Sequence, residues 1–451
     1  MKVDHALLLR TAGILAAISL PAGQVLAQGG AAEAASATAP ARADVASYAF
    51  PADWAGDSGA AKDPTERIHQ AALKWLEAAA GHCEKMVPAA EAVADRLIAG
   101  GALYVVGGEG FTNETFYRAG GFSFTRVWRR HRVRPNDVVI MGHLKPNDTG
   151  VPWIEFDAFH RFLNLRSGLI VQFTSFRWPQ TQRMFQPQEK GFWGGRLHRF
   201  DTGGPPGGLE ARALSQMATL ALAWAFQGEV IAAATRKGKT LATYASDDEP
   251  AAKEGWDESV AGHVFHPTCK VAPVPAGKLA RQYLQACREQ VSQFLTGQPA
   301  QVRRAAERMA RCAKAGGMIW AATSSHVLRD DCVMPHLPIL WVGRDYTFQQ
   351  SALRPGPDDM LLWMGYLHFP EEVVKAQTAR QVPSVVVSVE GPAAEGGTGL
   401  IHIASCWKAY DSAVELPGYP IRILPTSGIL HTLQWYSLMA ELARLTEEKK
   451  P

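Results

Sequence analysis

Two short stretches of sequence decide the fold: Ala-Gly-Gly-Ala-Leu-Tyr-Val-Val-Gly at residues 99–107 and Ala-Gly-Gly-Met-Ile-Trp-Ala-Ala-Thr at residues 315–323. In each stretch a Gly-Gly pair ends a helical pattern and leads into a compact apolar run. Such a run is typical of a buried strand in a parallel sheet that carries helices on both faces. The repetition predicts that one α/β module occurs twice in the chain.

Further landmarks recur in the same order in the two halves. They are Arg134-Pro-Asn-Asp with Arg354-Pro-Gly-Pro-Asp-Asp before the next strand, Gly142 with Gly365 after it, and Thr202-Gly-Gly with Thr426-Ser-Gly before a long helix. Each landmark falls at a strand end or a helix start, which favours duplication over chance. We predict an α/β protein with two doubly wound parallel-sheet domains in tandem, at residues 64–250 and 274–447, joined by a linker at 251–273.

The first 27 residues differ in composition from the rest of the chain. Lys2 and Arg10 precede an uncharged, largely apolar stretch at 11–23, and Val25-Leu26-Ala27 provides a small-residue cleavage site. This pattern predicts a secretory signal peptide and an exported protein, periplasmic or extracellular, with no membrane span after cleavage. The apolar stretch is shorter than the roughly 20 residues that span a bilayer. Residues 28–63 are rich in Ala, Gly, Ser and Pro, which predicts a flexible tether.

Charge and motifs exclude several classes of function. The 451 residues carry 46 Lys and Arg against 43 Asp and Glu, so no overall positive field exists for binding nucleic acid. The chain has no Gly-x-Ser-x-Gly, His-Glu-x-x-His, Walker A or Cys-x-x-Cys motif among its residues and only six cysteines. His263, His266 and Cys269 are closely spaced, but no further spaced ligands accompany them, so we expect no metal and no cofactor.

The order of these elements, with Asp411-Ser-Ala-Val-Glu-Leu-Pro and Pro425-Thr-Ser-Gly before the last helix, resembles the sugar isomerase (SIS) domain family. Tandem copies of that domain form phosphosugar isomerases, so the resemblance implies flavodoxin-like domains and a small sugar ligand. The phosphate-binding turns of the family are degenerate here: the first reads Gly107-Gly-Glu-Gly in one half and Thr323-Ser-Ser-His in the other. An ordinary phosphosugar isomerase activity is therefore not expected.

Four side chains near the strand ends are candidates for proton transfer. A carboxylate at Glu109 or Glu114 is suited to act as a general base at a sugar C1 or C2, and His143 or His368 is suited to assist. Each candidate also has a purely structural interpretation. Acids at a helix start stabilise the helix dipole, and histidines inside a core form hydrogen bonds there.

The candidate ligand-binding residues lie at the turns after the predicted strands, where open parallel sheets bind their ligands. Arg129 and Arg130 belong to a basic run suited to an acidic sugar, although a solvated loop has the same composition. The aromatic segment 173–200 is suited either to stacking on sugar rings or to covering a sheet edge or a homodimer face. The turn candidates are Gly107, Gly108, Thr323, Ser324, Ser325, Thr426 and Ser427.

Three functions remain open from the sequence. The first is an exported protein that binds a carbohydrate derivative and acts as a sugar isomerase-type enzyme by proton transfer. The second is a non-catalytic SIS-like protein that binds a sugar or an acidic sugar. The third is a periplasmic solute-binding protein, which also has two α/β lobes and closes by a hinge.

Overall fold

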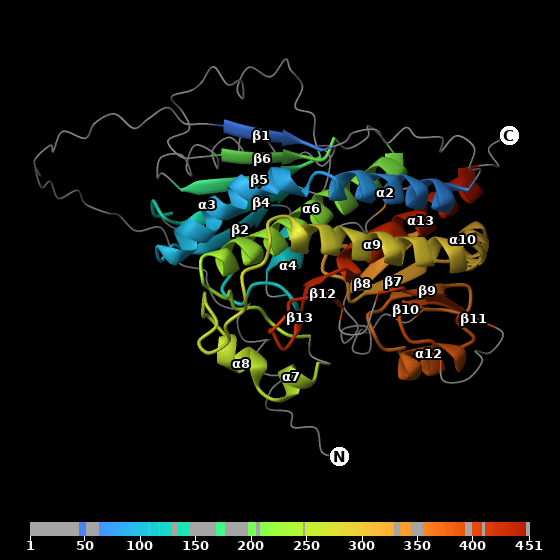
Figure 1. Ribbon diagram of the computed structural model, residues 1–451. Helices are drawn as coiled ribbons and strands as arrows, with labels where there is room; N and C mark the ends of the chain where they lie inside the picture. The colour runs from blue at the N-terminus through green and yellow to red at the C-terminus, as the bar shows by residue number, and fades with distance from the viewer. Residues whose placement is uncertain are drawn as a thin grey trace, which may run out of the picture. The chain divides into compact units, whose positions relative to one another are not determined.

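The computed structural model describes residues 45–50, 63–107, 109–116, 118–128, 133–143, 168–175, 197–203, 208–246, 249–328, 334, 336–343, 355–392, 399–407 and 411–447. The predicted signal peptide at 1–27 and most of the predicted tether at 28–63 lie outside these residues. Residues 42–451 form one compact unit, and Figure 1 shows its helices and strands.

Eleven of the described strands form two parallel sheets with the same internal order. The first runs β1-β6-β5-β4-β2-β3 and the second runs β11-β10-β9-β7-β8. Apart from β1, each strand of the first sheet therefore has a counterpart in the second. The expected α/β fold with two parallel-sheet domains is confirmed. The strands are β1 (Val45–Ala49), β2 (Leu103–Gly107), β3 (Arg126–Val127), β4 (Val138–His143), β5 (Leu169–Thr174), β6 (Leu197–Asp201), β7 (Ile319–Thr323), β8 (Ile339–Gly343), β9 (Met360–Met364), β10 (Ser384–Ser388) and β11 (Leu400–Ala404).

The recurring sequence landmarks have the same structural task in both halves. A side chain at Gly101 would collide with the Asn136 carbonyl oxygen at 1.9 Å, and one at Gly317 would collide with the Asp358 carbonyl oxygen at 2.0 Å. The second glycine of each pair is therefore required where the strand entrance passes close to another backbone.

The aspartate of each landmark ties the two strand entrances together. Asp137 accepts hydrogen bonds from the backbone N–H groups of Ala102 and Arg134, at 2.8 and 2.7 Å. Its counterpart in the second half, Asp359, accepts from Met318 and Gly356, both at 2.8 Å. Each carboxylate thus fixes the start of one strand relative to its neighbour, which explains why the sequence pattern occurs twice.

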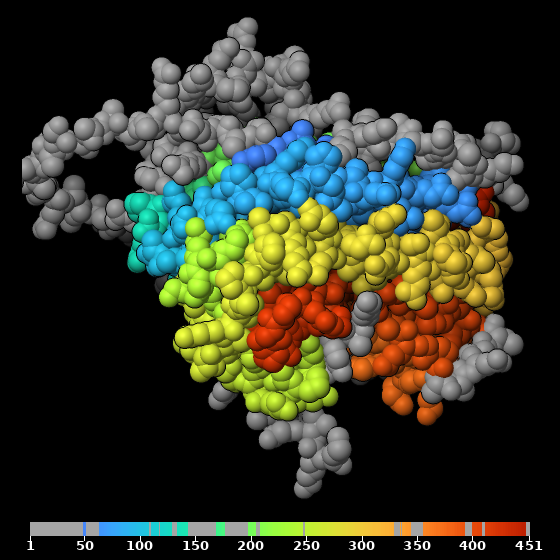
Figure 2. Space-filling model, viewed as in Figure 1, coloured from blue at the N-terminus to red at the C-terminus, as the bar shows by residue number. Residues whose placement is uncertain are grey.

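Helices cover the sheets and join the two halves. The first half has α2 (Pro64–Ala80), η2 (Cys83–Met86), α3 (Val87–Ile98), α4 (Glu109–Thr115) and α6 (Gly208–Arg236). The second half has α9 (Lys278–Gly297), α10 (Pro299–Lys314), α12 (Glu371–Thr378) and α13 (Ser427–Glu447), with a hairpin of β12 (Ser412–Glu415) and β13 (Arg422–Pro425). Helix α2 packs beside α9, and α6 packs beside α13 (Figure 1). On the face in Figure 2, α9 forms a yellow band next to the blue band of α2.

Helix α6 is the one described helix that is long and apolar enough to cross a membrane by length and composition. Its apolar window is entirely buried within the protein, and α2, α3, α9 and α13 pack around it. The helix therefore serves as a core helix of the fold.

Two segments differ from the sequence expectation. Residues 45–49 fall in the predicted tether but form β1, which pairs in parallel with β6. Tyr48 stacks on Phe200 with ring centroids 5.0 Å apart, and this contact holds the segment as an edge strand on β6. The predicted linker contains two short helices, α7 (Pro250–Lys253) and α8 (Trp256–Val260). The domain boundaries near 250 and 274 stay a prediction.

Candidate functional site

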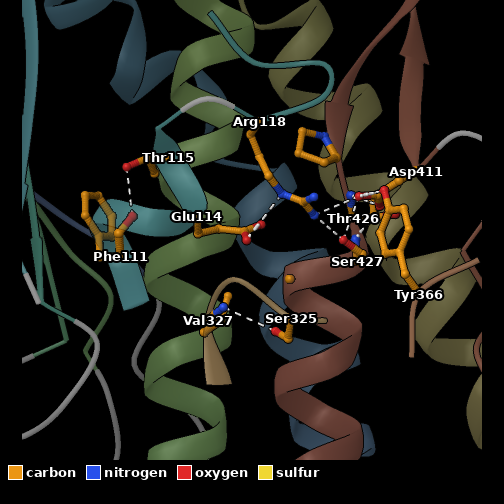
Figure 3. Close-up of polar contacts among 12 residues, drawn as sticks. Phe111, Glu114, Thr115, Arg118, Ser325, Val327, Tyr366, Asp411, Thr426 and Ser427 are labelled. Atoms are coloured by element: carbon orange, nitrogen blue, oxygen red, sulfur yellow. Dashed lines mark hydrogen bonds and ion pairs between the residues drawn. The ribbon is translucent and has the colours of Figure 1, made fainter. Parts of the chain in front are cut away.

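A buried cation from the first half reaches the carboxyl-end edge of the second sheet. Arg118 follows α4, which in turn follows strand β2, and its side chain is 7% exposed. Its Nη2 donates to Asp411 Oδ2 at 2.8 Å and to Ser427 Oγ, and its Nε lies 3.4 Å from Glu114 Oε2 (Figure 3). We call Glu114, Arg118, Tyr366, Asp411 and Ser427 the Arg118 cluster.

Asp411 is the best-satisfied member of the Arg118 cluster. Its Oδ1 accepts from the backbone N–H groups of Thr426 at 3.0 Å and Ser427 at 2.6 Å. Its Oδ2 accepts from Arg118, from the Tyr366 hydroxyl at 2.7 Å and from the Ser427 hydroxyl at 2.6 Å. Asp411 has a φ of 56° and is buried, so the left-handed backbone aims its carboxylate at the start of α13.

Glu114 is the second carboxylate of the Arg118 cluster and is poorly satisfied. Its side chain is 1% exposed, and its two oxygens accept no well-formed hydrogen bond among the described residues. Burial raises the pKa of Glu114 to about 7, and the negative charge of Asp411 adds to this rise against the opposing charge of Arg118. One guanidinium therefore lies between two carboxyls, and the buried Glu114 is the one whose pKa is raised toward neutral pH.

Aromatic residues enclose the Arg118 cluster on the side of the second sheet. The Arg118 guanidinium lies 5.8 Å from the ring centre of Tyr366, and the Tyr366 ring lies 5.7 Å from that of Trp407. His431 is buried, contacts Trp407 edge-on and hydrogen-bonds through Nε2 to the Gly365 carbonyl oxygen at 2.8 Å. Because that bond holds the turn after β9, His431 positions Tyr366.

The hydroxyl-rich turn at 323–325 lies beside the turn after β9. Ser324 donates through its hydroxyl to the Met364 carbonyl oxygen at 3.2 Å, and its backbone N–H donates to the same oxygen at 3.0 Å. The hydroxyls of Thr323 and Ser325 accept from the backbone N–H groups of Ser325 and Val327, at 2.9 and 3.2 Å. These bonds are those of two successive hydroxyl turns that fix the backbone after β7, with Ser324 the least buried of the three.

The structure brings only some of the predicted site residues together. Thr426 and Ser427 bind Asp411, and Glu114 lies 3.4 Å from Arg118, which binds the same aspartate. His368, in contrast, is exposed beyond the carboxyl end of β9 and pairs with Glu390 at 2.9 Å. Glu109 begins α4 and His143 ends β4, but their side chains lie outside the described structure. The roles assigned to all these residues from the sequence stay predictions.

Of the other predicted residues, Gly107 lies at a tight backbone position, and several more lie outside the described residues. Gly107 has a φ of 154° and a side chain there would lie 1.9 Å from the Gly142 carbonyl oxygen, so its part is to let β2 and β4 approach. Gly108, Arg129, Arg130 and the aromatic residues 176–196 lie outside the described residues.

The described residues hold no group of three or more His, Cys, Asp or Glu side chains that could hold a metal ion. In the closely spaced set at 263–269, His266 Nδ1 accepts from the backbone N–H of Cys269 at 2.9 Å, and the Cys269 thiol contacts the Gly418 carbonyl oxygen. These bonds shape a loop.

The sequence reasoning missed three members of the Arg118 cluster: Arg118, Tyr366 and Asp411. Asp411 was visible only as the start of a family motif, and its partner lies 293 positions earlier in the chain. Tyr366 followed a recognised strand and was the one of the three with a local signal. Because ligands bind beyond the carboxyl ends of parallel strands, a polar side chain directly after a buried strand, such as Tyr366, is a candidate site residue.

No family model matches this chain, and no curated protein matches it. Among the solved structures that are similar to it, three match over most of its length. A protein from Salmonella typhimurium LT2 named for sugar binding is 10% identical, with a TM-score of 0.45, and the match covers 84% of this chain and 98% of the other. The C-terminal domain of glucosamine-fructose-6-phosphate aminotransferase from Francisella tularensis is 7% identical, with a TM-score of 0.47 and coverages of 87% and 99%.

The third structure is a protein from Silicibacter pomeroyi DSS-3 named as a phosphosugar isomerase, 9% identical, with a TM-score of 0.39 and coverages of 85% and 98%. The identities and TM-scores are too low to carry an activity over to this chain, and its α/β fold with two parallel-sheet domains stands on the strand order.

Proposed function

We propose that this protein binds a carbohydrate derivative at the carboxyl-end edge of the second sheet, next to the Arg118 cluster. The observation that carries the proposal is the meeting of both halves at this edge, where Arg118 is held by Asp411 and Ser427. Open parallel sheets bind ligands beyond the carboxyl ends of their strands. Such binding sites carry a small number of precisely placed polar groups, and the Arg118 cluster holds polar groups in fixed positions at this edge.

The accessible groups at this edge suit sugar hydroxyls. Tyr366 is partly exposed and presents an aromatic ring, and Ser324 is a partly exposed hydroxyl on the adjacent turn. The exposed pair of His368 and Glu390 combines a donor with an acceptor. An aromatic face with hydroxyl, imidazole and carboxylate groups nearby can stack on a sugar ring and hydrogen-bond its hydroxyls.

The test is a thermal-shift screen of the full chain without residues 1–27 against glucose, glucosamine, glucuronate and glucose 6-phosphate. At least one sugar should raise the melting temperature with a saturating concentration dependence. His368→Ala should weaken the affinity for that sugar about fivefold, the equivalent of one net hydrogen bond. The exposed His263 provides the matched control, because His263→Ala should leave the affinity unchanged. A screen without any response, or equal effects of the two variants, would contradict the proposal.

A second function, proton transfer on the bound sugar, is favoured by the pKa of Glu114 at about 7. A carboxyl that titrates near neutral pH can accept a proton from sugar C2 and return it at C1, as aldose-ketose isomerisation requires. Because Glu114 is fully buried, this chemistry requires ligand binding to make its carboxyl accessible.

The test of proton transfer is deuterium incorporation at C2 of the sugar that stabilises the protein, followed by NMR in heavy water. Glu114→Gln should abolish the incorporation and keep the thermal shift, whereas the exposed Glu372→Gln should change neither. Incorporation at the wild-type rate in Glu114→Gln would exclude this residue as the base.

We also propose that the protein is exported and cleaved before Gln28. The support is the charge and apolar pattern of residues 1–27. Intact-mass analysis of the protein recovered from outside the cytoplasm should give a chain that begins at Gln28. A full-length chain recovered only from the cytoplasm would contradict the proposal.

A further inference from the structure

We propose that Asp411 is a built-in anion: its carboxylate fills an anion-binding site formed by the start of α13, Arg118 and Tyr366. This arrangement selects an unphosphorylated carbohydrate as the ligand of the site. The selection of the ligand rests on the proposed function, whereas the claim about Asp411 does not.

The surroundings of Asp411 have the composition of an anion site. Five donors converge on its two oxygens: two backbone N–H groups, two hydroxyls and one guanidinium, at distances of 2.6–3.0 Å. Backbone N–H groups at the start of a long helix, together with an arginine, are the groups with which proteins bind phosphate and carboxylate ions. Here the anion is supplied by the chain itself.

The site is built and closed rather than an incidental surface contact. Asp411 and Ser427 are buried, and the Arg118 side chain is 7% exposed. Glu114 points from the other side at the same guanidinium (Figure 3), and both of its oxygens are buried without a well-formed hydrogen bond. This second carboxyl shares the guanidinium with Asp411 through the 3.4 Å contact between Arg118 Nε and Glu114 Oε2, and it does not contact the other four donors of Asp411 among the interactions of the described residues.

The charge balance decides the class of ligand. Asp411 neutralises Arg118, so this buried guanidinium has no positive charge left to attract a phosphate. Deprotonation of Glu114 would make the Arg118 cluster negative, which repels a phosphate further. Sugar hydroxyls do not meet this repulsion, so an uncharged carbohydrate binds in preference to its phosphate ester.

The deciding experiment is chemical rescue of Asp411→Gly. Glycine tolerates the φ of 56° at this position, so the change removes the carboxylate without straining the backbone. We expect a lower melting temperature in sodium chloride and recovery of roughly half of the loss at saturating sodium formate of equal ionic strength. Asp411→Asn is the matched control, because its amide fills the space and should leave formate without effect.

Two results would overturn the claim about Asp411. One is a folded Asp411→Gly that formate stabilises no more than chloride does, and the other is equal rescue of Asp411→Asn. If Asp411→Gly folds in neither salt, the test becomes the affinity of Asp411→Asn for glucose compared with its affinity for glucose 6-phosphate. Loss of the negative charge should improve the affinity for the phosphate relative to the free sugar by about tenfold; an unchanged ratio would refute the proposal.

The same experiments separate the two proposals. Formate rescue without any response of the wild-type protein to sugars would uphold the internal anion and contradict carbohydrate binding. Tight binding of glucose 6-phosphate by the wild-type protein, with formate rescue intact, would contradict only the selection against phosphate.

Discussion

Replacement of Glu114 by glutamine should change how the stability of this protein depends on pH. Burial holds the pKa of Glu114 at about 7 in the folded protein, against 4.5 for the ordinary group. A raised carboxyl pKa contributes stability that is fully present below the ordinary pKa and is lost as the pH rises through 7. Glutamine cannot ionise, so the variant lacks this loss.

The structure sets the size of the effect. The rise from 4.5 to about 7 corresponds to about 3 kcal/mol between the protonated and ionised limits. Between about pH 5 and about pH 9, linkage then predicts that the wild-type protein loses about 2–3 kcal/mol of unfolding free energy relative to Glu114→Gln. Most of this loss should occur between about pH 5 and about pH 7, where the carboxyl ionises in the unfolded chain but stays protonated in the folded protein, and little should be added above about pH 8.

The assay is chemical denaturation of both proteins across this pH range, followed by tryptophan fluorescence. Subtracting the two curves cancels other titrating groups, including Glu441, whose pKa burial also raises to about 7. The exposed Glu372→Gln should show no such pH-dependent difference. A constant difference between Glu114→Gln and the wild type would refute the reasoning, since it would mean that Glu114 is ionised throughout.

Three further outcomes follow from the packing and the pKa shifts. Gly428→Ala places a methyl 2.2 Å from a Glu114 oxygen and should destabilise the fold by about 1–3 kcal/mol in denaturation, whereas Gly297→Ala, with open space around it, should not. Burial lowers the pKa of His431 to about 4, so the wild type should lose stability as the pH falls below 6.5, and His431→Gln should lose less in acid denaturation. Burial raises the pKa of Cys83 and Cys287 to about 12, so these thiols should resist labelling by a thiol reagent near pH 8 until the protein is unfolded; rapid labelling of the native protein would contradict this.

The sequence predicted the duplicated sheet because the determining interactions are local. A glycine pair, an aspartate and an apolar run lie within about forty residues of one another in each half, and each has the same contacts in both. Strand β1 was missed because its stability comes from pairing with β6, about 150 positions later, and not from its own composition. Pairing partners at such distances leave little trace in a single sequence.

The candidate site was predicted only in part for a related reason. Glu114 was identified because it closely follows a recognisable strand, and Ser427 because it belongs to the Thr426-Ser-Gly landmark before a predicted long helix. Arg118 has no such signal, because its partner Asp411 lies in the other half and only folding brings them together. The sequence indicated the edge at which the site lies, and the structure supplied the residues that link the halves.

Among the described residues, the first half has no counterpart of the Arg118 cluster. The landmark Thr426-Ser-Gly corresponds to Thr202-Gly-Gly, so the first half has Gly203 where the second has Ser427. Gly203 N–H is bonded to the carboxylate of its near neighbour Asp201 at 2.8 Å, whereas Ser427 shares Asp411 with an arginine from the opposite half. The first half therefore contributes Arg118 to the carboxyl-end edge of the second sheet. The two sheets are alike in strand order but differ in chemistry, so we expect one binding site for each chain.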